Sequence, residues 1–201
     1  ATTHAYGVKV ASDAYGTWGS PGHPPIVDQQ GRSMSIAHQA MAAGLPVGLV
    51  QTGTSTEPGT GCFVASVPSR KQHEDIAVQL IESGCDLMLG GGEKYYLPKG
   101  VQGRHGMGVR EDGRNLIDEA RKAGYTVVFT ADELAAVPDT TDKLLGLFAE
   151  YHTFNDKPEE ELAAQGLPMY EPDAPSVAQM SDKALRILSK KGERFLMIVE
   201  E

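Results

Sequence analysis

Residues 74–92 read Glu-Asp-Ile-Ala-Val-Gln-Leu-Ile-Glu-Ser-Gly-Cys-Asp-Leu-Met-Leu-Gly-Gly-Gly, and this stretch decides the fold class. Its apolar residues at 76, 77, 80 and 81 have helical spacing, which predicts a helix over 74–82 that Gly84 stops. The apolar run 85–89 predicts a short buried strand. A helix followed at once by a buried strand is the repeating unit of an α/β sheet.

The same unit recurs on both sides of this stretch. Upstream, a helix over 33–43, capped by Ser33 or Ser35, ends at Gly44, and a strand over 45–50 follows. Downstream, the pattern predicts helix 116–123 with strand 125–129, helix 132–137 with strand 144–148, and helix 176–189 with strand 195–199. We therefore predict a three-layer α/β sandwich with a mostly parallel sheet.

The chain is expected to form one domain over residues 1–201, in four consecutive parts. Dense Gly and Pro predict a turn-rich opening over 1–32, and the α/β core follows over 33–149. Residues 150–174 are polar and proline-bearing and predict a loop insertion with a short helix at 159–164. Residues 175–201 supply the last helix and strand. The chain starts without Met and ends directly after a strand, so we expect a piece of a longer chain.

Composition excludes some classes of partner. The formal charge of −9 argues against nucleic acid and anionic membranes as main partners, although a local cationic site for an anionic substrate remains compatible with it. No apolar run approaches the roughly 20 residues of a membrane-spanning helix. The two cysteines, Cys62 and Cys85, lack zinc-site spacing and are expected as small core residues. The six histidines also lack ligand spacing and are expected at the surface or in loops.

Sites in parallel sheets gather where strands end at their carboxyl side, which directs attention to Gln51-Thr52 with the loop beyond, to Gly90–Gly92 and to Glu200-Glu201. The first candidate is Thr56–Gly61, where Glu57 and Thr60 offer the hard oxygen ligands that suit magnesium. The same residues also fit a simple helix start, with Thr60 as its cap and Pro58 in the turn before it.

Arg70 is the second candidate, because a guanidinium can bind two phosphate oxygens at once; the alternative is a solvated basic helix end. Glu200 is the third. A carboxylate at the end of the buried strand 195–199 needs a partner or a metal, unless the strand has already ended and the side chain is solvated. The run Gly90–Gly92 could cradle phosphate but lacks the spacing of a phosphate loop, so a structural turn is the alternative.

Taken together and in order, the strings of this chain resemble the alkaline phosphatase family. The resemblance covers nearly all residues. It rests on Gly7-Val8-Lys9, on 41–50 (MAAGLPVGLV), on 64–70 (VASVPSR), on 86–92 (DLMLGGG), on 144–148 (LLGLF), on 176–184 (SVAQMSDKA) and on 195–200 (FLMIVE).

The resemblance implies an alkaline-phosphatase-like fold with an incomplete core, and it assigns roles to four residues. Arg70 matches the arginine that grips two oxygens of the substrate phosphate, which makes it both a catalytic and a substrate-binding residue. Glu200 and Thr60 match ligands of the family's magnesium. Pro58 stands where family members often have Asp or His, so the nearest carboxylate, Glu57, becomes a third candidate ligand.

The resemblance also places essential groups outside the chain. The nucleophilic serine of the family would fall just before Ala1, and most zinc ligands would follow Glu201. The implied whole protein is a magnesium- and zinc-dependent phosphomonoesterase that acts on small phosphate esters through a phosphoserine. A homodimer and a periplasmic or extracellular location are compatible with the family. The isolated chain is expected to be inactive.

Two other functions stay open from the sequence. One is a non-catalytic module that binds phosphate or a divalent metal. The other is a related hydrolase of the same superfamily, a phosphodiesterase or a sulfatase. The Ser69-Arg70 pair and the LGGG and LLGLF strings favour the phosphatase.

Overall fold

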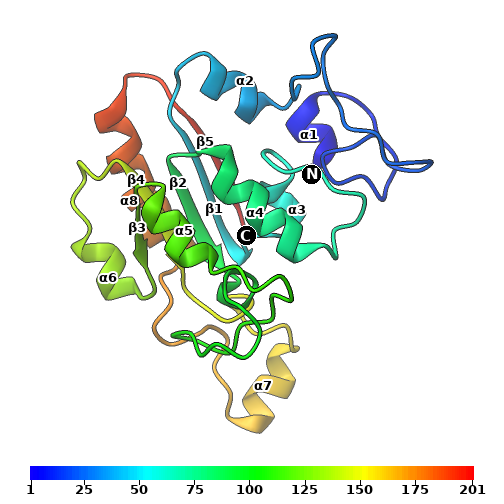
Figure 1. Cartoon of the computed structure of the whole chain (residues 1–201). Coiled ribbons are helices and arrows are strands. Elements are labelled where there is room, and N and C mark those ends of the chain that lie inside the picture. Colours follow the sequence, from blue (N-terminus) through cyan, green and yellow to red (C-terminus); the bar gives the residue numbers. More distant parts are fainter.

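Five parallel strands form a single sheet in the order β3-β4-β2-β1-β5 (Figure 1). The computed structural model describes all residues, Ala1–Glu201. The strands are β1 (Val47–Thr54), β2 (Leu87–Gly91), β3 (Tyr125–Val128), β4 (Lys143–Leu147) and β5 (Leu196–Glu200). The helices are α1 (Thr2–Tyr6), α2 (Ile36–Ala42), α3 (Pro58–Gly61), α4 (His73–Ser83), η1 (Glu93–Tyr96), α5 (Leu116–Lys122), α6 (Ala131–Ala136), α7 (Glu159–Gln165) and α8 (Val177–Lys191).

Alternate residues of each strand point to opposite faces of the sheet, and this divides the core in two. Met88 of β2 packs in a cluster with apolar residues of α4 and α5. Its neighbours Leu87 and Leu89 pack in a second cluster with α8, which contributes Met180, Ala184, Ile187 and Leu188. Helices therefore cover both faces of a parallel sheet, and the predicted three-layer α/β class is confirmed.

The helix ends follow the capping signals. Ser35 accepts a hydrogen bond from the backbone N–H of His38 and caps α2, so Ser35 rather than Ser33 is the cap. Ser176 and Gln179 form a reciprocal capping box at the start of α8. Gly84 ends α4 in the left-handed region, with a φ of 73°.

The turn-rich opening departs from the expected all-loop structure because it contains α1, whose Ala5 and Tyr6 are buried in the core. Strand β1 is also longer than predicted. It continues through Gln51 and Thr52 to Thr54, because these polar residues keep the extended pairing beside β5 and β2. Likewise β2 includes Gly90 and Gly91, and Gly91 allows the backbone of Tyr151 to pass closely.

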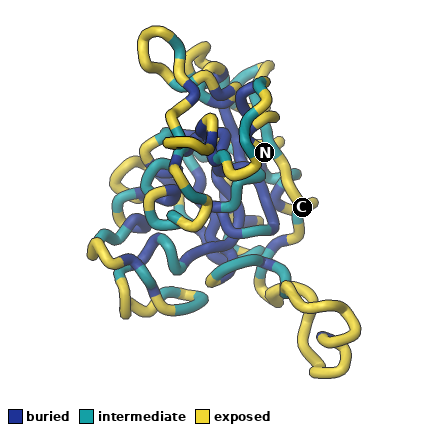
Figure 2. The backbone as a smooth tube through the Cα atoms, turned by 90° about the vertical axis from the view of Figure 1, so that its right-hand side faces the viewer, coloured by how far each residue is buried: buried dark blue, intermediate teal, exposed yellow.

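The edges of this body differ in burial. Figure 2 shows the buried backbone concentrated along the sheet and an exposed arm that carries α7 away from it. At the sheet edge, the residues of β5 are half-buried or exposed, so the core is least filled there.

Both cysteines are buried as expected, and burial raises the pKa of each thiol to about 12. None of the helices has the length and apolar character that a membrane crossing needs.

Candidate active site

A cavity of about 450 Å³ opens where β1 and β5 end at their carboxyl side. This is the edge at which ligands bind in open parallel sheets. Its polar lining comprises Gln51, Thr52, Glu57, Arg70, His152, Glu200 and Glu201. The first residue, Ala1, also lines it, and Figure 1 shows the two chain ends close to α3.

Of the carboxylates that line the cavity, Glu57 and Glu200 come from different elements. Glu57 immediately precedes α3, in the N-cap position, and Pro58 is the first helical residue. Glu200 is the last residue of β5 and pairs in register with Gln51 of β1. A Cβ atom added to Gly59 would lie 1.2 Å from a carboxylate oxygen of Glu200. The Glu200 carboxylate therefore lies against Gly59 of α3 and would have to shift if position 59 carried a side chain.

The alternative of a plain helix start at residues 56–61 is partly realised. The helix begins at Pro58, where a missing N–H costs nothing. Thr60 is not the cap: it lies inside α3, is 1% exposed and does not line the cavity. Of the predicted magnesium ligands, the structure therefore brings Glu57 and Glu200 to one cavity and leaves Thr60 buried within α3, outside the cavity lining.

Arg70 supplies the positive charge of the cavity. Its guanidinium forms an ion pair with the Glu57 carboxylate, and 61% of its side chain is exposed. It is therefore neither buried nor simply a solvated helix end, because it lies at the cavity mouth beside a carboxylate. An arginine paired on one side only keeps donors free for a second anion.

Gln51 and His152 also line the cavity, and neither was among the predicted catalytic or ligand residues. Gln51 is 1% exposed, and neither its amide oxygen nor its amide nitrogen has a hydrogen-bond partner. His152, four residues beyond Phe148, accepts a hydrogen bond from the backbone N–H of Thr54 at 3.0 Å. The only sequence signal for either residue was its place just past the apolar part of a strand. The hydrogen bond itself could not be predicted, because Thr54 and His152 lie 98 residues apart.

Burial of His152 favours its neutral form. Burial lowers the pKa of His152, while the carboxylates of Asp156 and Glu57 act in the opposite direction. The ring stacks on Phe154 with centroids 4.8 Å apart and contacts the ring of Tyr151 at 3.9 Å. The other five histidines lie outside the cavity lining.

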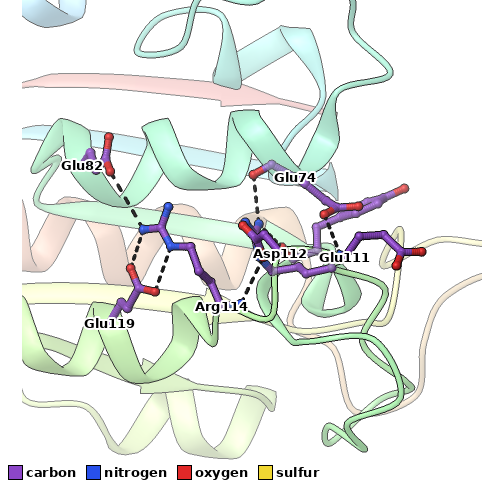
Figure 3. Close-up of polar contacts among 8 residues, drawn as sticks. Glu74, Glu82, Glu111, Asp112, Arg114 and Glu119 are labelled. Atoms are coloured by element: carbon purple, nitrogen blue, oxygen red, sulfur yellow. Dashed lines mark hydrogen bonds and ion pairs between the residues drawn. The ribbon is translucent and has the colours of Figure 1, made fainter.

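A second group of charges, the loop cluster, consists of Glu74, Arg110, Asp112, Arg114 and Glu119. Figure 3 shows Arg114 between Glu119 and Glu82, with Glu74 and Asp112 nearby. The Arg110 side chain is 1% exposed; it pairs with Asp112 and donates to the carbonyl oxygens of Glu74 and Tyr95 at 2.9 and 3.0 Å. The loop cluster therefore fastens the 97–114 loop onto α4 and α5.

The Gly90–Gly92 run does not reach the cavity. Gly92 has a φ of 98°, and a Cβ there would lie 2.0 Å from the Thr54 hydroxyl. Gly90 and Gly91 belong to β2, so only Gly92 fits the alternative of a structural turn, and close packing against β1 and Tyr151 accounts for the glycines of this run.

Comparison with known proteins identifies the family. A model of the family described as "Alkaline phosphatase" matches residues 1–201. The alkaline phosphatase of Escherichia fergusonii is 32% identical over 200 residues, which cover 83% of this chain and 41% of that protein. The membrane-bound alkaline phosphatase of Bombyx mori is 30% identical and matches 100% of this chain and 40% of its own length.

Solved structures agree. The alkaline phosphatase of Thermus thermophilus superposes with a TM-score of 0.72 at 31% identity, covering 100% of this chain and 37% of that one. The cold-active enzyme of a Shewanella species gives a TM-score of 0.69 at 26% identity, with 99% and 40% covered. The chain thus spans less than half the length of these relatives. Because the family model matches this chain over residues 1–201, the chain belongs to the alkaline phosphatase family.

Proposed function

We propose that this chain is a segment of a metal-dependent phosphomonoesterase and that it supplies the phosphate-binding arginine and part of a magnesium site. The observation that carries the proposal is the single cavity lined by Arg70, Glu57 and Glu200 at the carboxyl edge of the sheet. Family membership supports the reaction class. The substrates would be small phosphate monoesters.

Arg70 would bind two non-bridging oxygens of the phosphate and stabilise charge that develops on them during transfer. Its ion pair with Glu57 orients the guanidinium toward the cavity. Phosphoryl transfer needs little covalent work from such residues, because positioning and electrostatics supply most of the acceleration. In the whole protein the phosphate would be taken by a serine that this chain does not include.

The donor set fits magnesium better than zinc. Glu57 and Glu200 offer carboxylate oxygens, which hard cations prefer. Nowhere does the chain gather three His, Cys, Asp or Glu side chains into a metal-ligand group, so water or residues beyond this chain would complete the shell. When bound, magnesium would neutralise the two carboxylates beside an anionic substrate. Zinc ligands are proposed to lie outside the chain.

One solved protein of this fold, a variant of the alkaline phosphatase from the Antarctic bacterium TAB5, has Mg bound in its M3 site. At 22% identity that likeness establishes the fold alone. The magnesium proposal therefore rests on the two carboxylates in the cavity. Thr60 is the third proposed ligand; it is 1% exposed and does not line the cavity, so its side chain would have to move to reach the ion.

The test compares two proteins in hydrolysis of p-nitrophenyl phosphate at alkaline pH, with magnesium and zinc added. One is this 201-residue chain and the other is the full-length enzyme that carries it. We expect turnover by the full-length enzyme alone. Turnover by the short chain at a comparable rate would show that the nucleophile lies within it. A full-length protein that binds phosphate without turnover would support the non-catalytic module instead.

A further inference from the structure

A buried amide faces the cavity without a partner. The Gln51 side chain lines the cavity, is 1% exposed, and leaves both its oxygen and its nitrogen without a hydrogen bond. Native proteins pair nearly all such groups, because a buried amide loses its hydrogen bonds to water and costs free energy unless protein or ligand atoms replace them. A ligand that enters the cavity can supply the missing partner.

His152 is set up as a hydrogen-bond donor. The backbone N–H of Thr54 donates to Nδ1 at 3.0 Å, so this nitrogen uses its lone pair and carries no proton. The neutral imidazole then carries its proton on Nε2. A protonated nitrogen cannot ligate a metal, so Nε2 suits an oxygen acceptor. Its nearest carboxylate, Asp156, is 3.5 Å away, and that side chain is largely exposed.

Gly53 lies close to both of these side chains. A Cβ on Gly53 would lie 3.6 Å from the Gln51 amide oxygen and 3.6 Å from Nδ1 of His152. Stacking on Phe154, with an interplanar angle of 7°, fixes the plane of the imidazole ring. The two donors are therefore presented by rigid elements, an internal strand and a stacked ring.

We infer that Gln51 and His152 donate hydrogen bonds to oxygens of the phosphate group that Arg70 binds. The inference rests on the proposed function, and it makes the two residues substrate-binding groups of that site. A phosphate monoester has several acceptor oxygens that point in different directions, and donors from separate elements match it better than one arginine alone. Glu57 and Glu200 are acceptors and would face the cation instead.

The decisive experiment measures the affinity of inorganic phosphate for the full-length enzyme by calorimetry, using two substitutions of one residue. His152→Asn keeps an acceptor for the Thr54 N–H and loses the Nε2 donor, whereas His152→Gln keeps a donor near Nε2 and loses the acceptor. We expect about tenfold weaker phosphate binding for His152→Asn and a change within about twofold for His152→Gln. The reverse order would show that the histidine only supports Thr54, and the inference would be wrong.

Gln51→Met tests the amide with a side chain of similar shape, and Gln102→Met, an exposed glutamine outside the cavity, is its control. We expect about tenfold weaker phosphate binding for the first and no change for the second. Unchanged phosphate affinity with altered Mg²⁺ affinity would assign both residues to the metal and overturn the inference. Arg70→Ala separates failure of the inference from failure of the proposed function. If Arg70→Ala also leaves the phosphate affinity unchanged, the proposed function is wrong. If Arg70→Ala weakens phosphate binding but the Gln51 and His152 variants do not, only the inference is wrong.

Discussion

The cavity and the loop cluster both pair arginine with carboxylates, but they differ in how completely their polar atoms are satisfied. In the loop cluster, Arg110 is buried and its donors reach Asp112 and two backbone carbonyls. In the cavity, Arg70 is largely exposed with one partner, and Gln51 is buried with none. Saturated pairing holds a loop in place, whereas unfinished pairing leaves capacity for a ligand.

The largest expected effect breaks the cavity side of this comparison. Arg70→Ala in the full-length enzyme should lower kcat/KM for p-nitrophenyl phosphate by about 100- to 1,000-fold, the usual cost of losing one preorganised donor to a developing anion. Its unfolding should hardly change, because the side chain is 61% exposed. Arg114→Ala, which removes an arginine of the loop cluster, is the matched control and should leave kcat/KM near the wild-type value. Equal losses of kcat/KM in Arg70→Ala and Arg114→Ala would show that the cavity and the loop cluster do not differ in their contribution to activity.

The second prediction concerns the loop-cluster side. Arg110→Met keeps much of the aliphatic stem but leaves the carbonyl oxygens of Glu74 and Tyr95 without their donor. We expect the free energy of unfolding to fall by about 3 kcal/mol, since buried acceptors lose their partners. Denaturant titration of the full-length enzyme measures it. A loss below about 0.5 kcal/mol would mean that water replaces the guanidinium without cost.

The helices and strands could be predicted from the sequence wherever local signals define them. Local signals predicted the helices and strands well: Gly84 ends α4, Ser35 caps α2, and each apolar run became a strand. The α1 helix was missed because its short sequence, Thr-Thr-His-Ala-Tyr, has no helical apolar spacing. Strand β1 was cut short because its last residues are polar.

The site was predictable only where one residue type implies one chemistry. Arg70 and the carboxylates Glu57 and Glu200 stood out for that reason, and they meet in one cavity. Gln51 and His152 did not, because their burial and hydrogen bonding depend on contacts between residues far apart in the sequence. The hydrogen bond between Thr54 and His152 spans 98 residues, and an unpaired amide can be recognised only once its surroundings are known.

A third, smaller effect sharpens the metal part of the cavity. Glu200→Gln keeps the shape of the side chain and removes its negative charge, so Mg²⁺ should bind the full-length enzyme about tenfold more weakly. Equilibrium dialysis measures this directly, without turnover. Glu193→Gln, an exposed residue just before β5, provides the control. Equal Mg²⁺ affinity in Glu200→Gln and wild type would show that Glu200 does not bind the ion.

The smallest effect is a pH dependence within the loop cluster. The hydrogen bond from Arg110 holds the pKa of Asp112 below its ordinary value. A carboxyl with a lowered pKa in the folded state adds stability above its ordinary pKa, and this contribution is lost as the pH falls through and below about 4. Wild type should therefore exceed Asp112→Asn in unfolding free energy at pH 6, and the gap should shrink at pH 3. Because Asp112 is 41% exposed, solvent screens the pair and the gap should be small. A gap that does not change with pH would mean that Asp112 stabilises the loop cluster through the shape of its hydrogen bond to Arg110 rather than through its charge.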